Sequence, residues 1–554
     1  MKKHIFLAGV LMLLFSSCGD FLDYNENSDY DQNKLFNTTW SNTDFVTGIY
    51  AYLPGSLSDV GGALRSAGCD EAEYVWPTSA IHRYYDGSWS ALRAVDDKWG
   101  HYYKAIRACN DYLEHGTGKD WKEFEFKKDY AKMMRKYRNL EWEVKALRAY
   151  YYFELVKRYN RIPLITKVLT EEEANNQEPV DYQTVINFIV RECDEVAEDG
   201  RLPAIYNADY DNETGRVSKI FALALKARAL LYAASPLNNP NAETNPDKWI
   251  EAAKAAKKII DASGSWNLSL VPFDQLLGPD NFKAAEMILI KRIGDTNELE
   301  KLNFPIGLEG GKSGNCPTQN LVDAYDMKEG QEMDEANPYA NRDPRLAYTV
   351  LYHGGNTAYG KQVDVLPNGL NGLPQEGATK TGYYLSKFVN INVSLTANNT
   401  TTARHSIPLF RYAEVLLIYA EAMNEAYGPE GVTEELNISA RTAINMVRGR
   451  TGLGIAALTV EDVPSKTAFR LALRKERMAE LAFEDHRFWD IRRWKIGSET
   501  TKIKRVSISK AGEGLSFEYS VTTDRTWDDS MYFYPIPQAE IYKNSKLVQN
   551  PGWK

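Results

Sequence analysis

The sequence has few residues of the kinds that build metal and redox sites. Only 5 of its 554 residues are cysteine and 7 are histidine. Cys69, Cys109, Cys193 and Cys316 are spaced too widely for a zinc pattern or a CxxC motif, and the histidines form no HExxH arrangement. No acidic loop has the ligand spacing of an EF-hand, so calcium is not indicated. We expect cysteines that are free or incidentally paired, and no cofactor.

Motifs for catalysis and for nucleic-acid binding are missing as well. The sequence has no GxSxG elbow, no phosphate-binding loop and no Rossmann fingerprint. It has no run rich in lysine and arginine, and its formal net charge is -9. Because phosphate backbones are bound by a positive field, we expect no nucleic-acid partner. The sequence indicates no catalytic chemistry.

No stretch of the sequence is apolar over a length that would span a membrane, but the N-terminus has a shorter one. Lys2 and Lys3 precede an apolar run at residues 5–15, and small residues follow, as in a secretion signal. Residues 14–18, LFSSC, resemble a lipobox, in which Cys18 is diacylated and becomes the mature N-terminus. We expect a lipoprotein signal peptide at residues 1–17 and a flexible lipidated tether at 18–40. A plain signal peptide followed by a coincidental cysteine is the alternative.

The sequence is rich in aromatic residues and shows helical periodicity over long stretches. It contains 34 Tyr and 12 Trp, which suits a surface that binds something. Apolar residues recur at steps of three and four over long stretches, which predicts amphipathic helices. Successive helix pairs with small residues at the crossings predict a tetratricopeptide-like α-α superhelix. The predicted helices cover residues 130–159, 182–198, 218–234, 246–263, 411–427, 438–450 and 465–484.

Between the predicted helical stretches, glycine and proline recur often, which is typical of loops and short strands. We predict a mainly α fold with an irregular, loop-rich subdomain and short β-hairpins. All parts belong to one globular unit. They are the helical part at residues 41–267, with a ligand-loop insertion near 54–97, the loop-rich part at 268–406, and the closing helices and C-terminal tail at 407–554.

The charged stretch at residues 470–494, RLALRKERMAELAFEDHRFWDIRRW, mixes charged and apolar groups on one predicted helical face that includes Phe483 and Arg487. Glycoside hydrolases use a pair of carboxyl groups for catalysis, and Glu476 and Glu480 are close enough in the sequence to suggest such a pair. Groups one turn apart lie side by side, however, whereas a glycosidase needs them on two sides of the scissile bond. With several arginines nearby we interpret this stretch as a buried ion-pair network that closes the scaffold.

An ordered series of motifs runs along the chain: GRVSK, NRDPRL, IPLFRYAEVLLIYAEA, INMVRGRTGL, ER..EL.FE..R..D.RRW, YPIP and QNPGW. This series gives the chain a resemblance to the SusD/RagB family of outer-membrane nutrient-binding lipoproteins. It implies a SusD-like fold and a cell-surface protein, without catalytic activity, that binds oligo- or polysaccharide. The glycan would be delivered to a SusC-like TonB-dependent transporter in the outer membrane, where acylated Cys18 would hold the protein. A surface glycoside hydrolase and a peptide-binding lid of the same type of transporter are the alternatives.

Two loop regions offer the flat aromatic platforms and polar groups that a sugar site needs. For each ring in the first loop, burial that pins the loop to the scaffold is the competing interpretation, and for the second loop it is a purely structural role. The first region contributes Asp70, Tyr74, Trp76, His82, Tyr84, Tyr85 and Trp89, and the second contributes Asn315 and Gln319, joined by Asp343 and Arg345.

Overall fold

The computed structural model describes residues 35–55, 58–206, 213–355, 357–358 and 361–553. The predicted signal peptide, Cys18 and most of the predicted tether lie outside these residues. Within the described part of the chain, no helix combines the length and the apolar character needed to cross a membrane.

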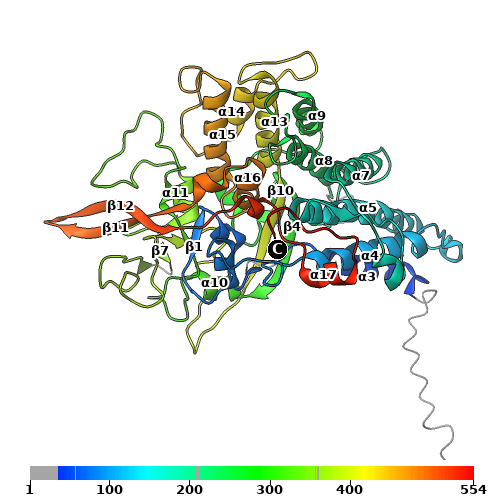
Figure 1. Cartoon of the computed structure of the whole chain (residues 1–554), viewed down its shortest axis with the longest axis horizontal. Coiled ribbons are helices and arrows are strands. Elements are labelled where there is room, and N and C mark those ends of the chain that lie inside the picture. Colours follow the sequence, from blue (N-terminus) through cyan, green and yellow to red (C-terminus); the bar gives the residue numbers. More distant parts are fainter. Residues whose placement is uncertain (1–34, 56–57, 207–212, 356, 359–360, 554) are drawn as a thin grey trace, which may run out of the picture.

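The fold is mainly helical, as predicted, and its long helices form one continuous array (Figure 1). Neighbours in the array follow the chain, with α4 against α5, α5 against α7, α7 against α8 and α8 against α9. α5 has the predicted bounds, and Asn160, with a φ of 64°, ends it before Pro163. The helices are α3 (Thr39–Tyr50), α4 (Trp99–His115), α5 (Tyr130–Tyr159), α6 (Glu171–Ala174), α7 (Tyr182–Val196), α8 (Lys219–Ala234) and α9 (Asp247–Ala262).

Local chemistry explains where these helices begin and which face they bury. The side chain of Asp181 accepts a hydrogen bond from the backbone N–H of Thr184 at 2.9 Å at the start of α7, and Ser218 caps α8 in the same way. Val185, Ile189 and other residues at helical spacing are buried between α5 and α8. Capping and periodicity therefore act together at α7 and α8, whereas α5 and α9 begin without a side-chain cap and were predicted from periodicity.

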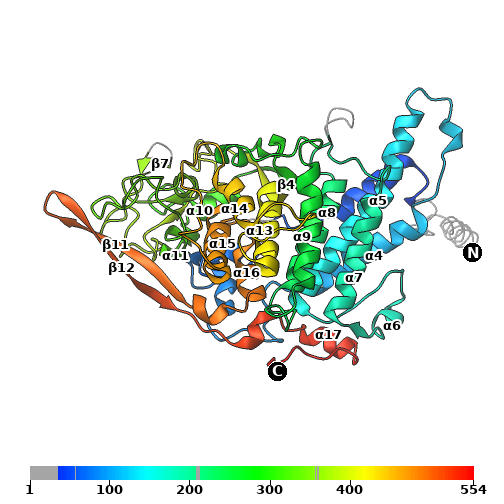
Figure 2. The same cartoon turned by 90° about the horizontal axis from the view of Figure 1, so that it is seen from above.

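The array continues on the far side of the loop-rich part. α13 packs against α9, although about 150 residues separate the two helices in the sequence, and α14 and α15 pack against α13 (Figure 2). The remaining helices are α10 (Glu298–Asn303), α11 (Gln319–Val322), α12 (Arg345–Thr349), α13 (Tyr412–Tyr427), α14 (Ala440–Arg448), α15 (Lys466–Glu480), α16 (Arg487–Arg493) and α17 (Gln538–Lys543).

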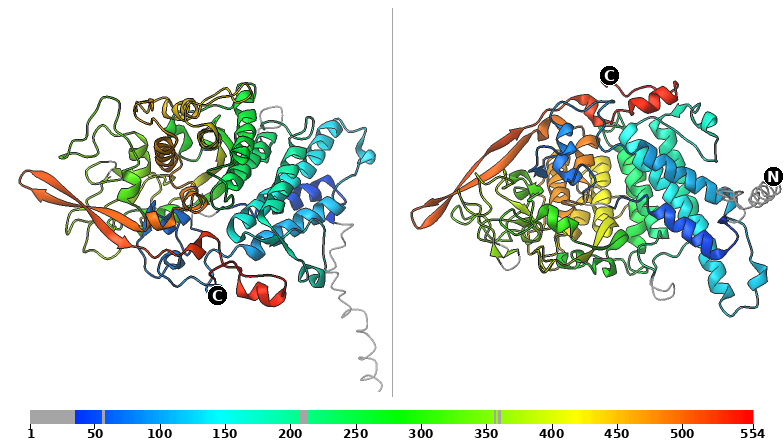
Figure 3. Two further views of the ribbon diagram at one scale, coloured as in Figure 1. Left: turned by 45° about the horizontal axis from the view of Figure 1, so that its top comes forward. Right: turned by 90° about the horizontal axis from the view of Figure 1, so that it is seen from below.

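Strands in the described residues form antiparallel pairs rather than a large sheet. Two pairs, β4–β10 and β11–β12, are longer than the short strands we expected. The β11–β12 hairpin projects from the loop-rich part, at the end of the molecule opposite α3 (Figure 3). The pairs are β1 (Ala72–Tyr74) with β5 (Asn315–Pro317), β2 (Ile162–Pro163) with β3 (Pro179–Val180), β4 (Met287–Thr296) with β10 (Ala403–Arg411), β6 (Val350–Leu351) with β9 (Tyr384–Leu385), β7 (Thr357–Ala358) with β8 (Lys361–Gln362), and β11 (Lys502–Ala511) with β12 (Gly514–Asp524).

The charged stretch at residues 470–494 contains two helices, whereas we predicted one helix at 465–484 whose face continued to Arg487. α15 ends at Glu480, and α16 begins at Arg487. Between them Phe483 and Asp485 have φ values of 59° and 63°, in the left-handed region that non-glycine residues rarely adopt. Phe483 and Arg487 therefore do not share a helical face with Glu480, which corrects that part of the prediction.

The ion-pair network itself is present, but its partners come from elsewhere in the chain. Glu480 is fully buried and accepts hydrogen bonds from Arg345 at 2.8 Å and from Arg411 and Arg450 at 2.6 Å each. Glu476 pairs with Arg345 at 2.6 Å. We had expected the charged residues of the stretch to satisfy mainly one another. Within the stretch, Asp490 does pair with Arg477 and Arg493 at 2.8 Å each. The carboxylates Glu476 and Glu480, however, join α15 to β10, to α12 and to the segment after α14.

This network predicts a loss of stability in acid. Burial alone would raise the pKa of Glu480, but Arg450, Arg411 and Arg345 outweigh it and hold the pKa well below its usual range. A carboxylate whose pKa is lower in the folded state stabilises the fold above its unfolded pKa, about 4.3 for Glu, and this stability is lost as the pH falls below that value. Urea unfolding between pH 7 and pH 3 should show the decline beginning near pH 5. A free energy of unfolding that stays constant over this range would contradict the prediction.

Candidate functional site

The structure brings the two predicted ligand loops together. β1 and β5 pair antiparallel, with Ala72 opposite Pro317 and Tyr74 opposite Asn315. The indole N–H of Trp76 donates a hydrogen bond to the backbone oxygen of Lys312 at 2.7 Å. Because the pairing is antiparallel, Trp76 lies at the Lys312 end of this ribbon, whereas Gln319 lies at its other end. The two loops are neighbours, but Trp76 and Gln319 are not.

Most rings of the first loop are buried, which corrects their assignment as sugar platforms. Tyr84 and Trp89 contact each other edge to face, with ring centroids 4.9 Å apart, and both pack against Tyr534. Tyr74 is also buried, and Tyr85 lies 3.9 Å beneath the guanidinium of Arg525. These rings hold the loop against the C-terminal segment, so their faces are closed to a ligand.

Trp76 and His82 are the predicted rings of this loop that keep part of their surface open. Both are partly exposed. The two ring nitrogens of His82 are occupied by the backbone oxygen of Trp76 at 2.9 Å and the hydroxyl of Tyr85 at 2.7 Å. His82 therefore positions the loop, and Trp76 is the residue of the first loop that remains a candidate for ligand contact.

The predicted polar residues Asp70, Asn315, Asp343 and Arg345 are all buried. Asp70 accepts hydrogen bonds from Arg487 at 2.7 and 2.8 Å. The carboxylate of Asp343 accepts three hydrogen bonds from the guanidinium of Arg345, which also binds the carboxylates of Glu476 and Glu480. Asn315 donates to Asn303. Their assignment to a sugar site is corrected: burial of these charges required partners, and the partners are protein groups.

Gln319, the remaining predicted residue, lines a groove of about 420 Å³ between α11, residues 338–342 and the β11–β12 hairpin. We call it the Tyr519 groove. Tyr519 is 48% exposed and offers an aromatic face beside hydrogen-bonding groups. A volume of this size falls within the range of small-molecule sites. The groove is lined by Gln319, Val322, Asp323, Met333, Pro338, Tyr339, Arg342, Lys504, Tyr519, Ser520 and Val521.

The walls of the Tyr519 groove are held firmly. Tyr339 stacks on Tyr352, with centroids 4.3 Å apart, and donates a hydrogen bond to the hydroxyl of Tyr383 at 3.2 Å. The amide of Gln319 donates to Asp323 at 2.7 Å. Arg342 donates to backbone oxygens, including that of Tyr325 at 2.6 Å. The side chains of Tyr339, Gln319 and Arg342 are therefore oriented before any ligand arrives, which lowers the entropy cost of binding.

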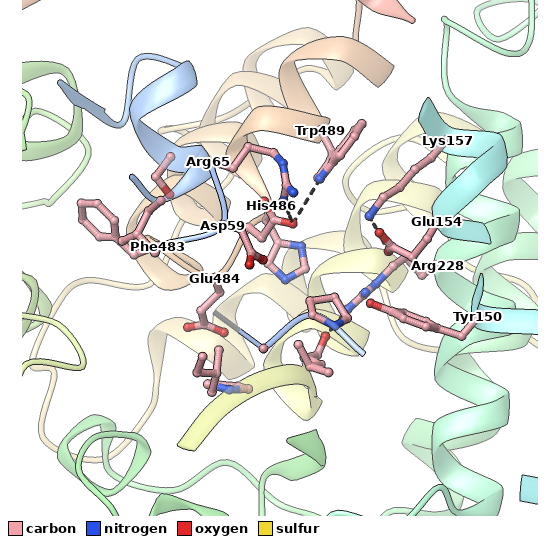
Figure 4. A pocket seen from close by; sticks show the side chains of 18 of the residues that line it. Asp59, Arg65, Tyr150, Glu154, Lys157, Arg228, Phe483, Glu484, His486 and Trp489 are labelled. Atoms are coloured by element: carbon pink, nitrogen blue, oxygen red, sulfur yellow. Dashed lines mark hydrogen bonds and ion pairs between the residues drawn. The ribbon is translucent and has the colours of Figure 1, made fainter. Parts of the chain in front are cut away.

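A second hollow, of about 90 Å³, lies between α5, α8, β10 and the turn from α15 to α16 (Figure 4). On its α5 side Lys157 pairs with Glu154, one turn earlier on the same helix, at 2.6 Å. Burial lowers the pKa of Lys157 to about 8, against the opposing pull of Glu154, and burial also lowers the pKa of His486. The cavity is far below the ~300 Å³ of typical ligand pockets. We therefore assign it to the scaffold.

A larger groove, of about 530 Å³, lies between α4, residues 163–175 and α17. Its aromatic residues, Trp99 and Tyr103, contact each other with centroids 5.2 Å apart, and Trp99 is buried. The hydroxyl of Tyr103 donates to the backbone oxygen of Pro163 at 2.8 Å. This groove offers less open aromatic surface than the Tyr519 groove.

Tyr339, Tyr519 and Lys504 were missed by the reasoning from sequence. A signal was present at Tyr519, because Phe517, Tyr519 and Val521 alternate with polar residues and so share one face of a strand. That pattern would have identified an apolar ridge on the predicted C-terminal hairpin. The alternating pattern does not show, however, that α11 and residues 338–342 face this ridge.

Comparison with known proteins finds one family along the chain. The model of the SusD family matches residues 294–553. SusD-like protein P38 of Formosa agariphila is 25% identical over 426 residues, which cover 74% of this chain and 73% of that protein. SusD-like protein P2 of the same organism is 32% identical over 160 residues, 28% of this chain and only 27% of its own length.

Solved structures share the whole fold. A SusD-like protein from Bacteroides fragilis superposes with a TM-score of 0.76 at 25% identity, covering 94% of this chain and 98% of that one. A second structure from this organism, described as a SusD-like carbohydrate binding protein, has a TM-score of 0.75 at 24% identity and covers 93% and 100% of the two chains.

Proposed function

The chain belongs to the SusD family, and on that premise we propose that it is a cell-surface glycan-binding protein of the outer membrane. It captures an oligosaccharide or polysaccharide and delivers it to a SusC-like TonB-dependent transporter. Lipid on Cys18 anchors it. The proposal is supported by the similar structure described as a carbohydrate binding protein.

The observation that carries the proposal is the pairing of an open aromatic face with fixed polar groups in the Tyr519 groove. Sugar rings have apolar C–H faces and polar edges. Tyr519 offers a stacking surface for the face, and the groove is also lined by Asp323 and Lys504, an ion pair at 3.6 Å whose half-exposed side chains can hydrogen-bond to hydroxyls. Trp76, at the other end of the β1–β5 ribbon, is a second candidate contact.

The chemistry of the groove favours binding over hydrolysis. Glycoside hydrolases use two carboxyl groups that flank the scissile bond. Among the described residues that line the Tyr519 groove, Asp323 is the one carboxylate. Glu476 and Glu480 are buried in ion pairs and cannot supply the second.

Replacing Tyr519 by alanine should weaken glycan binding about tenfold, which corresponds to about 1.4 kcal/mol, because a stacking surface is removed. Affinity gels cast with a panel of polysaccharides identify the ligand, and calorimetry on the best one measures the change. The matched control is Tyr542→Ala on α17, since Tyr542 is 79% exposed and lies outside the groove.

Three outcomes count against parts of the proposal. Release of sugar products from the polysaccharide would favour a hydrolase. Affinity for peptides without affinity for any glycan would favour a peptide-binding lid. Unchanged affinity in Tyr519→Ala, together with a loss in Trp76→Ala, would move the site to the Lys312 end of the β1–β5 ribbon.

A further inference from the structure

Tyr383 lies directly behind the Tyr519 groove, and its side chain is fully buried. Its hydroxyl donates a hydrogen bond to the side-chain oxygen of Gln319 at 2.5 Å and accepts one from the hydroxyl of Tyr339 at 3.2 Å. Gln319 and Tyr339 both line the groove. A buried residue therefore connects two side chains of the groove wall. We call the hydrogen-bonded series Tyr339, Tyr383, Gln319 and Asp323 the Tyr383 relay.

Asp323 fixes the direction of every hydrogen bond in the Tyr383 relay. As a carboxylate paired with Lys504 at 3.6 Å, it can only accept hydrogen bonds. The side-chain nitrogen of Gln319 lies 2.7 Å from Asp323, so the amide oxygen of Gln319 must face Tyr383. Tyr383 has one hydroxyl proton and gives it to that oxygen. Tyr339 must then give its own proton to Tyr383.

The relay leaves the hydroxyl of Tyr339 able to accept a hydrogen bond from a ligand but not to donate one, because its proton is given to Tyr383. Asp323, whose side chain is 49% exposed, is likewise an acceptor only. Burial raises the pKa of Tyr339 and the pKa of Tyr519; the hydroxyl of Tyr519 adds to the first shift and Asp323 adds to the second, so all three lie near one another. The two acceptors require a donor on the ligand, whereas half-exposed Lys504 can donate to any ligand oxygen.

We propose that Tyr383 is a positioning residue that makes the Tyr519 groove selective for sugar residues with free hydroxyl groups. The inference rests on the proposed function, because it takes this groove as the glycan site. A free hydroxyl donates to Tyr339 or Asp323. An O-methylated sugar keeps an oxygen that can only accept, so it leaves these groups unpaired. Sites built to pair with a ligand hydroxyl reject analogues that lack the hydrogen bond much more strongly than apolar pockets reject a change in size.

Tyr383→Phe tests this role, because it removes the hydroxyl and keeps the buried ring. The hydroxyl of Tyr339 is then free to turn its proton toward the groove. The probe is whichever of starch, inulin, mannan and xylan the wild-type protein retains in an affinity gel, in native form and after partial O-methylation. We expect the wild type to bind the native form about tenfold more tightly than the methylated form, and Tyr383→Phe to lower this ratio about threefold or more. The bulk of the methyl groups penalises both proteins alike, so the change in the ratio measures the hydrogen bond.

Tyr182→Phe is the matched control for Tyr383→Phe. Tyr182 is also buried, on α7, and its hydroxyl has no hydrogen-bond partner among the residues that the structure describes. This variant should keep the wild-type ratio. Asp323→Asn tests the relay at its half-exposed end, without a change in the core. An asparagine can donate to Gln319 as well as accept from it, so the direction of the relay is no longer fixed and the ratio should fall as in Tyr383→Phe.

Neutron diffraction from crystals exchanged into deuterium oxide locates the deuterons of the relay without any ligand. A Tyr339 deuteron that points into the groove would overturn the proposal. An unchanged ratio in Tyr383→Phe, or an equal loss of affinity for both forms of the polysaccharide, would overturn it as well. Binding of the native form that is lost in Tyr519→Ala would in those cases leave the proposed function standing. Retention of none of the four polysaccharides would count against the proposed function, and the deuteron positions would still decide the direction of the relay.

Discussion

Replacing Glu480 by alanine should lower the free energy of unfolding by about 3–5 kcal/mol, the range measured when one partner of a buried ion pair is removed. Glu480 is fully buried, and its carboxylate receives hydrogen bonds from three guanidinium groups, those of Arg345, Arg411 and Arg450. Without it, these cations stay buried with fewer acceptors. The loss is measured by urea unfolding at pH 7.

A matched surface variant tests whether the large loss of stability in Glu480→Ala depends on burial. Glu435 pairs with Lys254 at 2.5 Å, but both side chains are about half exposed. Glu435→Ala should change the free energy of unfolding by no more than about 1 kcal/mol, because water and salt screen such pairs. Similar losses in Glu480→Ala and Glu435→Ala would show that the buried network does not stabilise the fold as we infer.

Replacing Cys18 by serine should release the protein from the membrane fraction almost completely. The acyl chains would be lost, and each CH₂ group buried in the bilayer contributes about 0.8 kcal/mol to anchoring. Cell fractionation and metabolic labelling with palmitate measure the outcome.

Ser17→Ala is the matched control for this experiment. It changes the neighbouring residue but keeps the cysteine thiol, so the protein should remain labelled and membrane-bound. If the Cys18→Ser protein stayed in the membrane fraction at high salt, the anchor would have to lie elsewhere.

The helices could be predicted from the sequence because their signals are local. α5 has the predicted bounds, and α7, α8, α9 and α13 begin within one residue of the predicted positions. Periodic apolar residues and capping side chains lie within a few positions of one another, so neither depends on the rest of the fold. The break between α15 and α16 was missed, since the left-handed residues Phe483 and Asp485 give no such signal.

The aromatic residues of the first loop show why the site could not be predicted equally well. Composition alone cannot separate a ring that stacks on a ligand from one that anchors a loop. Tyr84 and Trp89 are buried because Tyr534, about 450 residues later in the chain, packs against both. Arg345 is unavailable to a ligand because Glu476 and Glu480 reach it from α15.

The sequence by itself determined the helical array, the presence of a buried ion-pair network and the family to which the chain belongs, because periodicity and ordered motifs are properties of neighbouring residues. Only the tertiary structure decided which side chains are available to a ligand. In the folded chain most of the aromatic rings expected to contact a sugar are buried, and the Tyr519 groove lies between α11, residues 338–342 and the β11–β12 hairpin. The physical reason is that burial depends on contacts between segments far apart in the chain, and no local pattern encodes them.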